Sequence, residues 1–266
     1  MKNEIVILIT GCSTGIGREL CNILSQKGCT VVATARNVEA LKDLSASLKL
    51  SLDVTQKESI HRAVNEVISK FHKIDILINN AGYSLRGALE EIDVNRSKSM
   101  FDVNVFGIIN MVQAVVPEMR KKRCGKIINI GSISGKFAQP INGTYCASKF
   151  AVEALSDTLR LELHSYNIQT TVIEPGPMKT NFFKALVDNS GDVIKNEKSC
   201  YSHFYKSDAQ YRNKQKRADS KVAAQAISDT ILKKRLNARY KVAVPFTYKM
   251  VTYFPDFLRE YFMKKR

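Results

Sequence analysis

Two side chains that could move a proton stand four residues apart in GTYCASKF, residues 143–150. Residues i and i+4 share one face of a helix, so a helix here would bring the Tyr145 phenol and the Lys149 ammonium together. The same pair would also suit an ordinary polar helix face. The choice depends on whether the chain supplies a cofactor site, a hydroxyl beside the tyrosine and a substrate pocket.

Short runs rich in β-branched residues alternate with helix-period segments on both sides of that pair. The runs predict strands at 4–11, 28–36, 50–54, 75–82, 125–132 and 168–176, and the segments 55–71 and 148–163 are two of the expected helices. Such alternation is typical of βαβ units, and a continuous apolar strand fits a position covered on both sides. We therefore predict an α/β fold, a doubly wound parallel sheet of the Rossmann type with helices on both faces.

The chain is expected to form a single domain over residues 1–266. The segment 178–220 interrupts the alternation, because it is polar, basic and rich in turn residues with isolated apolar groups. It follows a strand end, where open α/β sheets bind ligands, so we expect it to cover the substrate. A helix should resume near 223, a last strand is expected at 240–245, and 253–266 is typical of an amphipathic tail.

The composition excludes several classes of protein. The chain of 266 residues is 44% hydrophobic and 25% charged, as is typical of a soluble globular protein. No uninterrupted apolar run reaches the roughly 18 residues of a membrane span. The apolar start enters a glycine-rich turn, which favours a strand over a signal peptide. We therefore expect a cytoplasmic protein.

The cysteines and the net charge indicate no metal and no nucleic acid. The six cysteines form no C-x-x-C pair, so we expect reduced thiols and no metal site. The net charge of +16 is large, but no helix-turn-helix, zinc-finger or RNA-recognition signature accompanies it. We interpret the excess as a solvated basic surface.

A glycine-rich turn, TGCSTGIG at 10–17, follows the first predicted strand and precedes a helix. Glycines there would let the backbone approach a pyrophosphate, whose charge the free N–H groups of the helix start would stabilise. The spacing G-x-x-x-G-x-G departs from the G-x-G-x-x-G fingerprint, and a purely structural turn is the alternative. The position in the alternating chain favours a dinucleotide.

The residues at the end of the second predicted strand are expected to contact the ribose of that cofactor. Ala35 and Arg36 stand there, and no carboxylate occurs before Glu39. An acidic residue would bind the 2′-hydroxyl of NAD, whereas arginine accommodates a 2′-phosphate. The sequence therefore favours NADP(H) with Arg36 as main contact and Asn37 as a weaker one, and leaves NAD(H) as the alternative.

Seven motifs in order now amount to a resemblance. TGCSTGIG, LDV, NNAG, FDVNVFG, Ser132 in NIGSISG, YCASK and EPGPMKT occur at intervals similar to those of the short-chain dehydrogenase/reductase family, over roughly residues 4–181. More loosely, the C-terminal part resembles the branch of 17β-hydroxysteroid and retinol dehydrogenases and acyl-dihydroxyacetone-phosphate reductases. The resemblance implies a homodimer or homotetramer.

The resemblance also implies catalytic roles. Tyr145 would be the general acid/base, and Lys149 would lower the pKa of its phenol by opposite charge and hold the ribose. Ser132 would polarise and orient the substrate oxygen. Asn104 would hold a water that connects Lys149 to solvent, or its amide would simply satisfy a helix irregularity.

Further residues are carried over as contacts, whereas Asn79 more simply ties neighbouring strands together. Implied cofactor contacts are Thr10, Gly11, Ser13, Thr14, Gly15, Ile16, Gly17, Arg36, Asn37, Asp53, Val54, Asn80, Ala81, Gly82, Tyr145, Lys149, Pro175, Gly176 and Thr180. Implied substrate contacts are Ser132, Tyr145, Met178, Phe182 and Phe183.

The resulting hypothesis is an NADP(H)-dependent oxidoreductase that interconverts a carbonyl and an alcohol. Apolar residues on the expected cover favour a lipophilic substrate such as a steroid, retinoid or acyl ketone. A non-catalytic dinucleotide-binding sensor or scaffold on the same fold is the alternative. The tail at 253–266 would be a peripheral membrane anchor, or would pack against the sheet or a neighbouring subunit.

Overall fold

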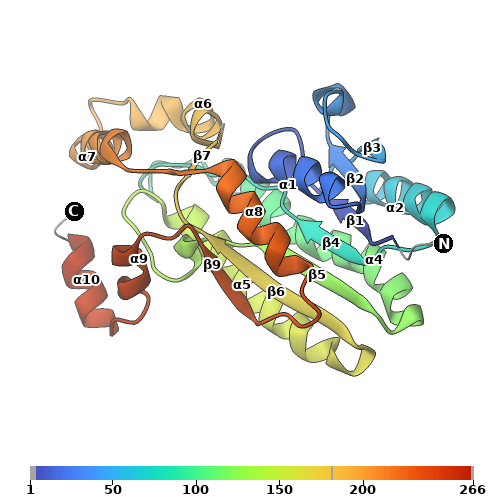
Figure 1. Cartoon of the computed structure of the whole chain (residues 1–266). Coiled ribbons are helices and arrows are strands. Elements are labelled where there is room, and N and C mark those ends of the chain that lie inside the picture. The colour runs from blue at the N-terminus through green and yellow to red at the C-terminus, as the bar shows by residue number, and fades with distance from the viewer. Residues whose placement is uncertain (1–3, 181, 265–266) are drawn as a thin grey trace.

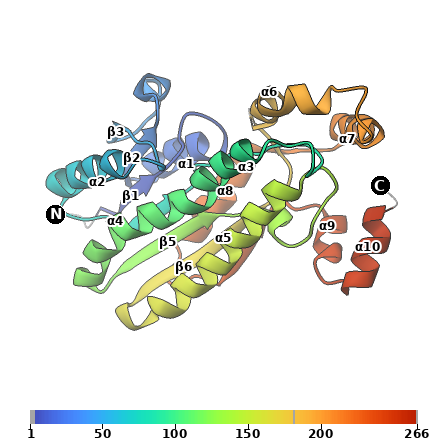
Figure 2. The same cartoon turned by 180° about the vertical axis from the view of Figure 1, so that it is seen from behind.

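A parallel sheet forms the centre of the molecule. The computed structural model describes residues 4–180 and 182–264, without the side chains at 183, 184, 256 and 262–264. Within these residues a seven-stranded sheet has the order β3-β2-β1-β4-β5-β6-β9, and all neighbouring strands pair in parallel. Helices cover both of its faces (Figure 1; Figure 2). The predicted doubly wound α/β fold is confirmed.

The elements follow the predicted alternation. The strands of the sheet are β1 Val6–Ile9, β2 Thr30–Ala35, β3 Leu48–Ser51, β4 Ile76–Asn79, β5 Gly125–Ile130, β6 Ile168–Pro175 and β9 Arg239–Val242. The helices packed on the sheet are α1 Gly15–Gln26, α2 Lys57–Phe71, α4 Gly107–Lys122, α5 Gly143–Glu162 and α8 Ser220–Ile231, and α3 Val94–Phe101 packs against α5.

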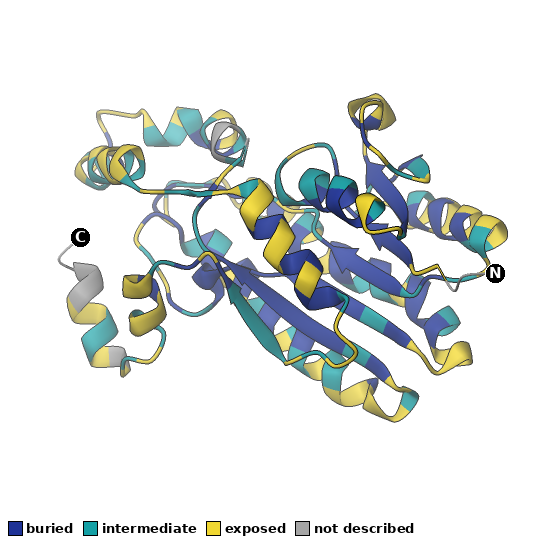
Figure 3. Ribbon diagram, viewed as in Figure 1, coloured by how far each residue is buried: buried dark blue, intermediate teal, exposed yellow. Residues whose placement is uncertain are grey.

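The core lies in two layers, one on each face of the sheet. Successive strand residues point to opposite faces, so Ile7 and Ile9 belong to the layer under α1 and α8, while Val6 and Leu8 belong to the layer under α2 and α4. Figure 3 shows the central strands buried almost throughout, whereas the edge strand β9 is mostly intermediate. Burial on both faces explains why a central strand such as β1 is continuously apolar.

The strand order reverses between β2-β1 and β4-β5. Parallel strands in this arrangement leave a crevice at their carboxyl ends, where connecting loops depart to opposite sides. The predicted strand at 50–54 is shifted, because β3 pairs Leu48–Ser51 with Val32–Ala35 and ends before Asp53. Asp53 therefore lies in the loop at this edge of the sheet.

The segment 178–220 differs from its predicted turn-rich character. It forms α6 Phe182–Ile194 and α7 Ser202–Lys214, and a two-stranded sheet of β7 Met178–Lys179 and β8 Ala218–Asp219 ties its ends together. The two helices lie beyond the carboxyl ends of the strands (Figure 1). The sequence pattern did not predict these helices, because most of their surface is polar and solvated. They bury only a few apolar residues, such as Leu186 and Tyr205.

The C-terminal region forms two short helices beside the sheet, α9 Phe246–Val251 and α10 Asp256–Lys264. Tyr248 of α9 stacks on Phe137 with ring centroids 5.7 Å apart. Arg259 of α10 donates a hydrogen bond to the Lys136 carbonyl at 3.1 Å. The tail is thus attached to the domain, although the Phe257 side chain remains 70% exposed.

A continuous helix runs through α3, a π-helical turn at Asp102–Phe106 and α4. By length and composition, Val94–Lys122 would be able to cross a membrane. Met111 and Val115 in this segment are fully buried against the sheet. The segment is therefore one of the core helices of the domain.

Candidate functional site

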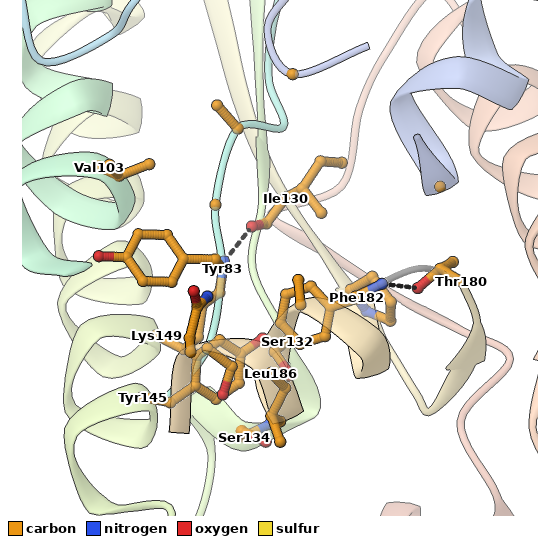
Figure 4. A pocket seen from close by; sticks show the side chains of 18 of the residues that line it. Tyr83, Val103, Ile130, Ser132, Ser134, Tyr145, Lys149, Thr180, Phe182 and Leu186 are labelled. Atoms are coloured by element: carbon orange, nitrogen blue, oxygen red, sulfur yellow. Dashed lines mark hydrogen bonds between the residues drawn. The ribbon is translucent and has the colours of Figure 1, made fainter. Parts of the chain in front are cut away.

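The Tyr145–Lys149 pair lies near the start of α5, which begins at Gly143, earlier than the predicted helix at 148–163. The Lys149 ammonium is 5.8 Å from the centroid of the Tyr145 ring, and it donates a hydrogen bond to the Ile130 carbonyl at 2.9 Å. Ile130 ends β5, so this bond ties the helix to the carboxyl edge of the sheet (Figure 4).

Ser132 brings a hydroxyl to the same place. It follows β5, and its Oγ accepts a hydrogen bond from the Ser134 amide at 3.1 Å, which fixes the turn that carries it. The Ser132 side chain also hydrogen-bonds Tyr145. Figure 4 shows Ser132, Tyr145 and Lys149 close together. The structure therefore unites three residues that the sequence separates by up to 17 positions.

The two titratable groups respond to burial in opposite directions. Burial raises the pKa of Tyr145 to about 12, although the hydrogen bond from Ser132 lowers it. Burial also lowers the pKa of Lys149 to about 8, against the opposing charge of Glu153. Burial therefore keeps the phenol a neutral acid in the cofactor-free protein, and the lowering of its pKa by Lys149 that the resemblance implies stays a prediction.

Asn104 occupies the π-helical turn between α3 and α4. Its Oδ1 accepts from the Tyr83 amide at 3.0 Å, and its Nδ2 donates to the Tyr83 carbonyl at 2.9 Å and to Ser148 Oγ at 3.1 Å. Single π-turns are frequent where a helix must aim a side chain inward. Asn104 therefore clamps the loop after β4 onto α5, and its role in a water relay stays a prediction.

The glycine turn joins β1 to α1 in close contact with the end of β4. Gly11 has φ +71°, and a Cβ there would come 2.8 Å from the Ala81 Cα. A Cβ on Gly17 would come 2.7 Å from the Gly11 carbonyl oxygen and 2.4 Å from Asn80 Nδ2. The backbone can approach this closely only because both residues lack side chains.

The start of α1 has an unneutralised N-terminus. Within the described residues, Thr14 makes no side-chain cap, and no acidic residue lies in the first turn. The first N–H groups of such a helix favour an anion. An uncapped helix start beside a turn without Cβ atoms fits the pyrophosphate of a dinucleotide.

A Gly17→Ala substitution should disturb this turn. We expect a lower melting temperature and at least a ten-fold weaker dinucleotide affinity, because the new methyl group would push α1 away from Asn80 and Gly11. Thermal melts and cofactor titration measure the two effects. Gly191→Ala in α6 is the matched control: its Cβ meets nothing closer than 3.9 Å, so melting should be unchanged or slightly raised. Equal behaviour of the two variants would contradict the close contact.

Most of the implied cofactor contacts line a cavity of about 1230 Å³ at the carboxyl edge of the sheet. Its lining includes Gly11, Ser13, Thr14, Gly15, Ile16, Arg36, Asp53, Val54, Asn80, Ala81, Gly82, Tyr145, Lys149, Pro175, Gly176 and Thr180.

Among the predicted site residues whose side chains the structure describes, four are not part of this lining: Thr10, Gly17, Asn37 and Asn104. The Thr10 hydroxyl lies behind it and accepts from the amides of Asn80 and Ala81 at 3.0 and 3.1 Å. Asn37 instead caps the 3-10 helix Val38–Leu41 by accepting from the Glu39 amide at 3.0 Å. A cofactor contact from Asn37 would compete with that cap, whereas Gly17 and Thr10 shape the turn from behind.

Asn79, by contrast, ties strands together as expected. Its amide donates to Asn129 Oδ1 at 2.8 Å, which joins β4 to β5.

The other part of the cavity borders α6 and has an apolar wall. Met178, Phe182 and Leu186 line it together with Ser132 and Tyr145. Phe182 meets the Tyr145 ring edge-to-face, with centroids 5.9 Å apart (Figure 4). The side chain of Phe183, the remaining expected substrate contact, lies outside the described part of the chain.

Several residues in the lining were not foreseen from the sequence. Tyr83 and Arg86 follow the NNAG motif in the loop after β4, Asp208 and Arg212 come from α7, and Tyr248 comes from α9. The charged i, i+4 pair of Asp208 and Arg212 was a local signal for a helix in this segment. Nothing local indicated that Tyr248 would reach the same cavity.

The fold and the site define a class of protein. A reversed strand order, a glycine turn opening onto an uncapped helix, and a buried tyrosine beside a lysine and a serine in one cavity are the features of a dinucleotide-dependent α/β oxidoreductase.

The chain belongs to the short-chain dehydrogenase family, whose model matches residues 5–191. It is 42% identical to a 3-ketodihydrosphingosine reductase of Bacteroides thetaiotaomicron over 177 residues, which make up 66% of this chain and 65% of that protein, less than two thirds of each. It is 32% identical to an oxidoreductase of Bacillus subtilis, YusZ, over 99% of both chains. The protein is therefore an oxidoreductase of this family, which uses a nicotinamide dinucleotide.

Solved structures agree with this assignment. A short-chain dehydrogenase from Streptomyces avermitilis superimposes with a TM-score of 0.81 at 27% identity, covering 100% of this chain and 94% of that one. The closed form of a serine dehydrogenase complexed with NADP+ gives 0.78 at 27% identity, over 89% and 94%.

Proposed function

We propose that the protein is an NADP(H)-dependent reductase or dehydrogenase that interconverts a lipophilic carbonyl compound and its alcohol. The observation that carries the proposal is the position of Ser132, Tyr145 and Lys149, which meet where the glycine-turn part of one cavity joins its apolar part. A bound nicotinamide dinucleotide supplies or accepts the hydride there.

The residues of the chain handle the proton and the substrate oxygen. In reduction, the Tyr145 hydroxyl donates its proton to the carbonyl oxygen as that oxygen gains charge. The Ser132 hydroxyl, already bonded to Tyr145, orients the same oxygen and stabilises its charge. The Lys149 ammonium is held by its hydrogen bond to the Ile130 carbonyl, and its positive charge stabilises the phenolate that forms when Tyr145 loses its proton.

Arg36 supports the preference for NADP(H). It is exposed beside the end of β2 and lines the cavity. Asp53, in the loop after the neighbouring strand β3, already accepts two hydrogen bonds from Thr55, at 2.9 and 2.8 Å. The cationic side chain is therefore better placed to bind a 2′-phosphate than a carboxylate is to bind a 2′-hydroxyl.

The substitution Arg36→Asp should lower the ratio of kcat/KM for NADPH over NADH at least ten-fold. It removes a charge-assisted bond to phosphate and adds an acceptor for the 2′-hydroxyl. Steady-state rates with each cofactor measure the ratio, and Arg62→Gln on the exposed face of α2 is the control. An unchanged preference would assign the phosphate to another residue.

The apolar lining supports a lipophilic substrate. Met178, Phe182 and Leu186 form an apolar wall against Tyr145, and one relative is named for a long-chain ketone. An NADPH-consumption screen across steroids, retinoids, acyl ketones, quinones and small aldehydes tests this proposal. Turnover of the small aldehydes alone would exclude a lipophilic substrate.

A non-catalytic sensor or scaffold is disfavoured by the same geometry. Such a protein has no need for a serine, a tyrosine and a lysine converging beside an apolar pocket. Cofactor binding without turnover of any carbonyl or alcohol would reverse this preference.

We further propose that the chain forms a homodimer or homotetramer through α3, α4 and α5. Exposed apolar residues on these helices and on the π-helical turn between α3 and α4 support this: Val94, Phe106, Phe150 and Leu161. Sedimentation as a monomer would exclude it. Cytoplasmic location and membrane contact through the tail at 253–266 stay predictions.

A further inference from the structure

Three charged side chains line the substrate part of the cavity. Arg86 comes from the loop after β4, and Asp208 and Arg212 come from α7 (Figure 1). Asp208 lies between the two arginines: Arg212 Nε donates to it at 2.6 Å, and Arg86 Nη1 is 3.6 Å away. The side chains are only 12% exposed at Arg86 and Arg212 and 14% at Asp208.

The cluster carries more positive than negative charge. Two guanidinium groups share one carboxylate, and Arg212 already holds that carboxylate in a hydrogen bond. The Arg86 contact is too long for a hydrogen bond, and its Nε is buried without a partner among the described residues. A largely buried guanidinium in this state is costly unless a further anion satisfies it.

No other carboxylate of the described lining belongs to this cluster. The remaining two are Asp53, which follows β3 and binds Thr55, and Asp102, which lies in the π-helical turn. Burial raises the pKa of Tyr145 and of the neighbouring Cys146, and the charge of Arg86 opposes this rise at both groups, so Arg86 acts near the start of α5. The excess positive charge therefore lies near the reacting phenol.

We propose that Arg86 and Arg212 bind an anionic group of the substrate, a carboxylate or a phosphate, so that the substrate is an anionic amphiphile. The proposal rests on the proposed function and adds the substrate class to it. The apolar residues of α6 would contact the apolar chain of the substrate. Ser132 and Tyr145 would hydrogen-bond its carbonyl oxygen, and the two guanidinium groups would bind its charged end. Arginine is suited to this because its planar fork binds both oxygens of such a group.

A purely structural role would be to fasten α7 to the loop after β4. That role needs one arginine and one carboxylate. With that role alone, the affinity of the pocket for a ligand would not depend on the charge of the ligand. The proposed role instead requires discrimination between ligands of equal length and different charge. An ammonium group in particular would be repelled by the two arginines.

Binding of unreactive probes to the full chain with NADP(H) tests the proposal directly. Dodecyl phosphate, dodecanoate, dodecanol and dodecylamine share one chain length, and calorimetry below their micellar concentrations gives each affinity. We expect at least one anionic probe to bind ten-fold or more tightly than the alcohol, and the amine to bind most weakly. The stronger of the two anions identifies phosphate or carboxylate. Equal binding of all four probes would overturn the proposal.

Variants connect this preference to the cluster. Arg86→Gln and Arg212→Gln should each lower the ratio of anionic to neutral affinity at least ten-fold, while Asp208→Asn should leave that ratio equal or raise it, because it frees the arginines. Arg62→Gln, exposed on α2, is the matched control and should leave the ratio unchanged. A ratio unaffected by both arginine variants would also overturn the proposal.

Turnover separates this inference from the proposed function. Matched ketones with neutral, cationic and anionic ends are compared by kcat/KM with NADPH. Reduction of the neutral ketone without a preference for the anionic one would support the proposed oxidoreductase function and contradict the proposed anion-binding role. Preferential binding of anionic probes without reduction of any ketone would support the anion-binding site and contradict the proposed oxidoreductase function.

Discussion

Replacing Tyr145 by phenylalanine is expected to lower kcat by about 10²–10⁴-fold, the range associated with one positioned acid/base group. The ring would still meet Phe182 edge-to-face, so the pocket should keep its shape. What disappears is the hydroxyl that hydrogen-bonds Ser132. The substrate oxygen would then have a hydroxyl to orient it but no proton donor of the chain beside it.

Steady-state rates and cofactor titration check this expectation together. Affinity for NADPH should change little, because the phenylalanine keeps the ring and leaves the glycine turn intact. Tyr166→Phe is the matched control: this tyrosine lies outside the cavity, in the 3-10 helix His164–Tyr166, and its variant should keep wild-type turnover. Full turnover by Tyr145→Phe with normal NADPH binding would remove Tyr145 from the proposed acid/base role.

The buried phenol also indicates how the site is prepared for reduction. A pKa raised to about 12 by burial keeps Tyr145 protonated throughout the physiological range. An acid in that state is ready to donate to a carbonyl oxygen, whereas the oxidation of an alcohol requires the phenolate. Positive charge brought close to the phenol is then what that reverse reaction needs, and Lys149 is the ammonium placed beside the ring.

The sequence predicted the features that depend on local patterns. Tyr145 and Lys149 share a helix face because of their spacing, and the strands were recognisable because both of their sides are buried. Ser132 was assigned through the resemblance of the motif NIGSISG, and its place after a strand agrees with that assignment, since parallel strands end at the same edge of a sheet.

The features that depend on distant packing were not predictable in this way. One cavity is lined by residues from a loop and two helices that are far apart in the chain: Arg86, Arg212 and Tyr248. The local periodicity of the sequence does not predict such long-range contacts. The segment 178–220 was expected to be rich in turns, because its two helices bury few apolar residues and expose most of their surface. A solvated helix with a weak apolar stripe resembles a loop in sequence.

Lys149 offers a test in which activity and stability should move in opposite directions. Lys149→Met removes an ammonium that burial disfavours strongly enough to lower its pKa to about 8. A lowering from the ordinary value of about 10.4 corresponds to on the order of 3 kcal/mol of unfavourable burial of the charge. The hydrogen bond to the Ile130 carbonyl offsets part of that cost. We expect the variant to lose turnover by about 10²-fold or more, because the phenolate is no longer stabilised.

The stability of the cofactor-free variant should be equal to that of the wild type at pH 7, or higher, and the comparison should depend on pH in a defined direction. The folded pKa of Lys149 lies below its unfolded value, so the cost of the buried charge is fully present below about pH 8. Between that pH and the unfolded pKa near 10.4, the folded lysine is neutral while the unfolded one still binds a proton, and wild-type stability rises relative to the methionine variant. Denaturant unfolding of both proteins at pH 7, 8, 9 and 10 measures this difference. A difference that stays constant over this range, or one that moves in favour of the variant, would show that burial does not lower the pKa of Lys149 in the folded protein.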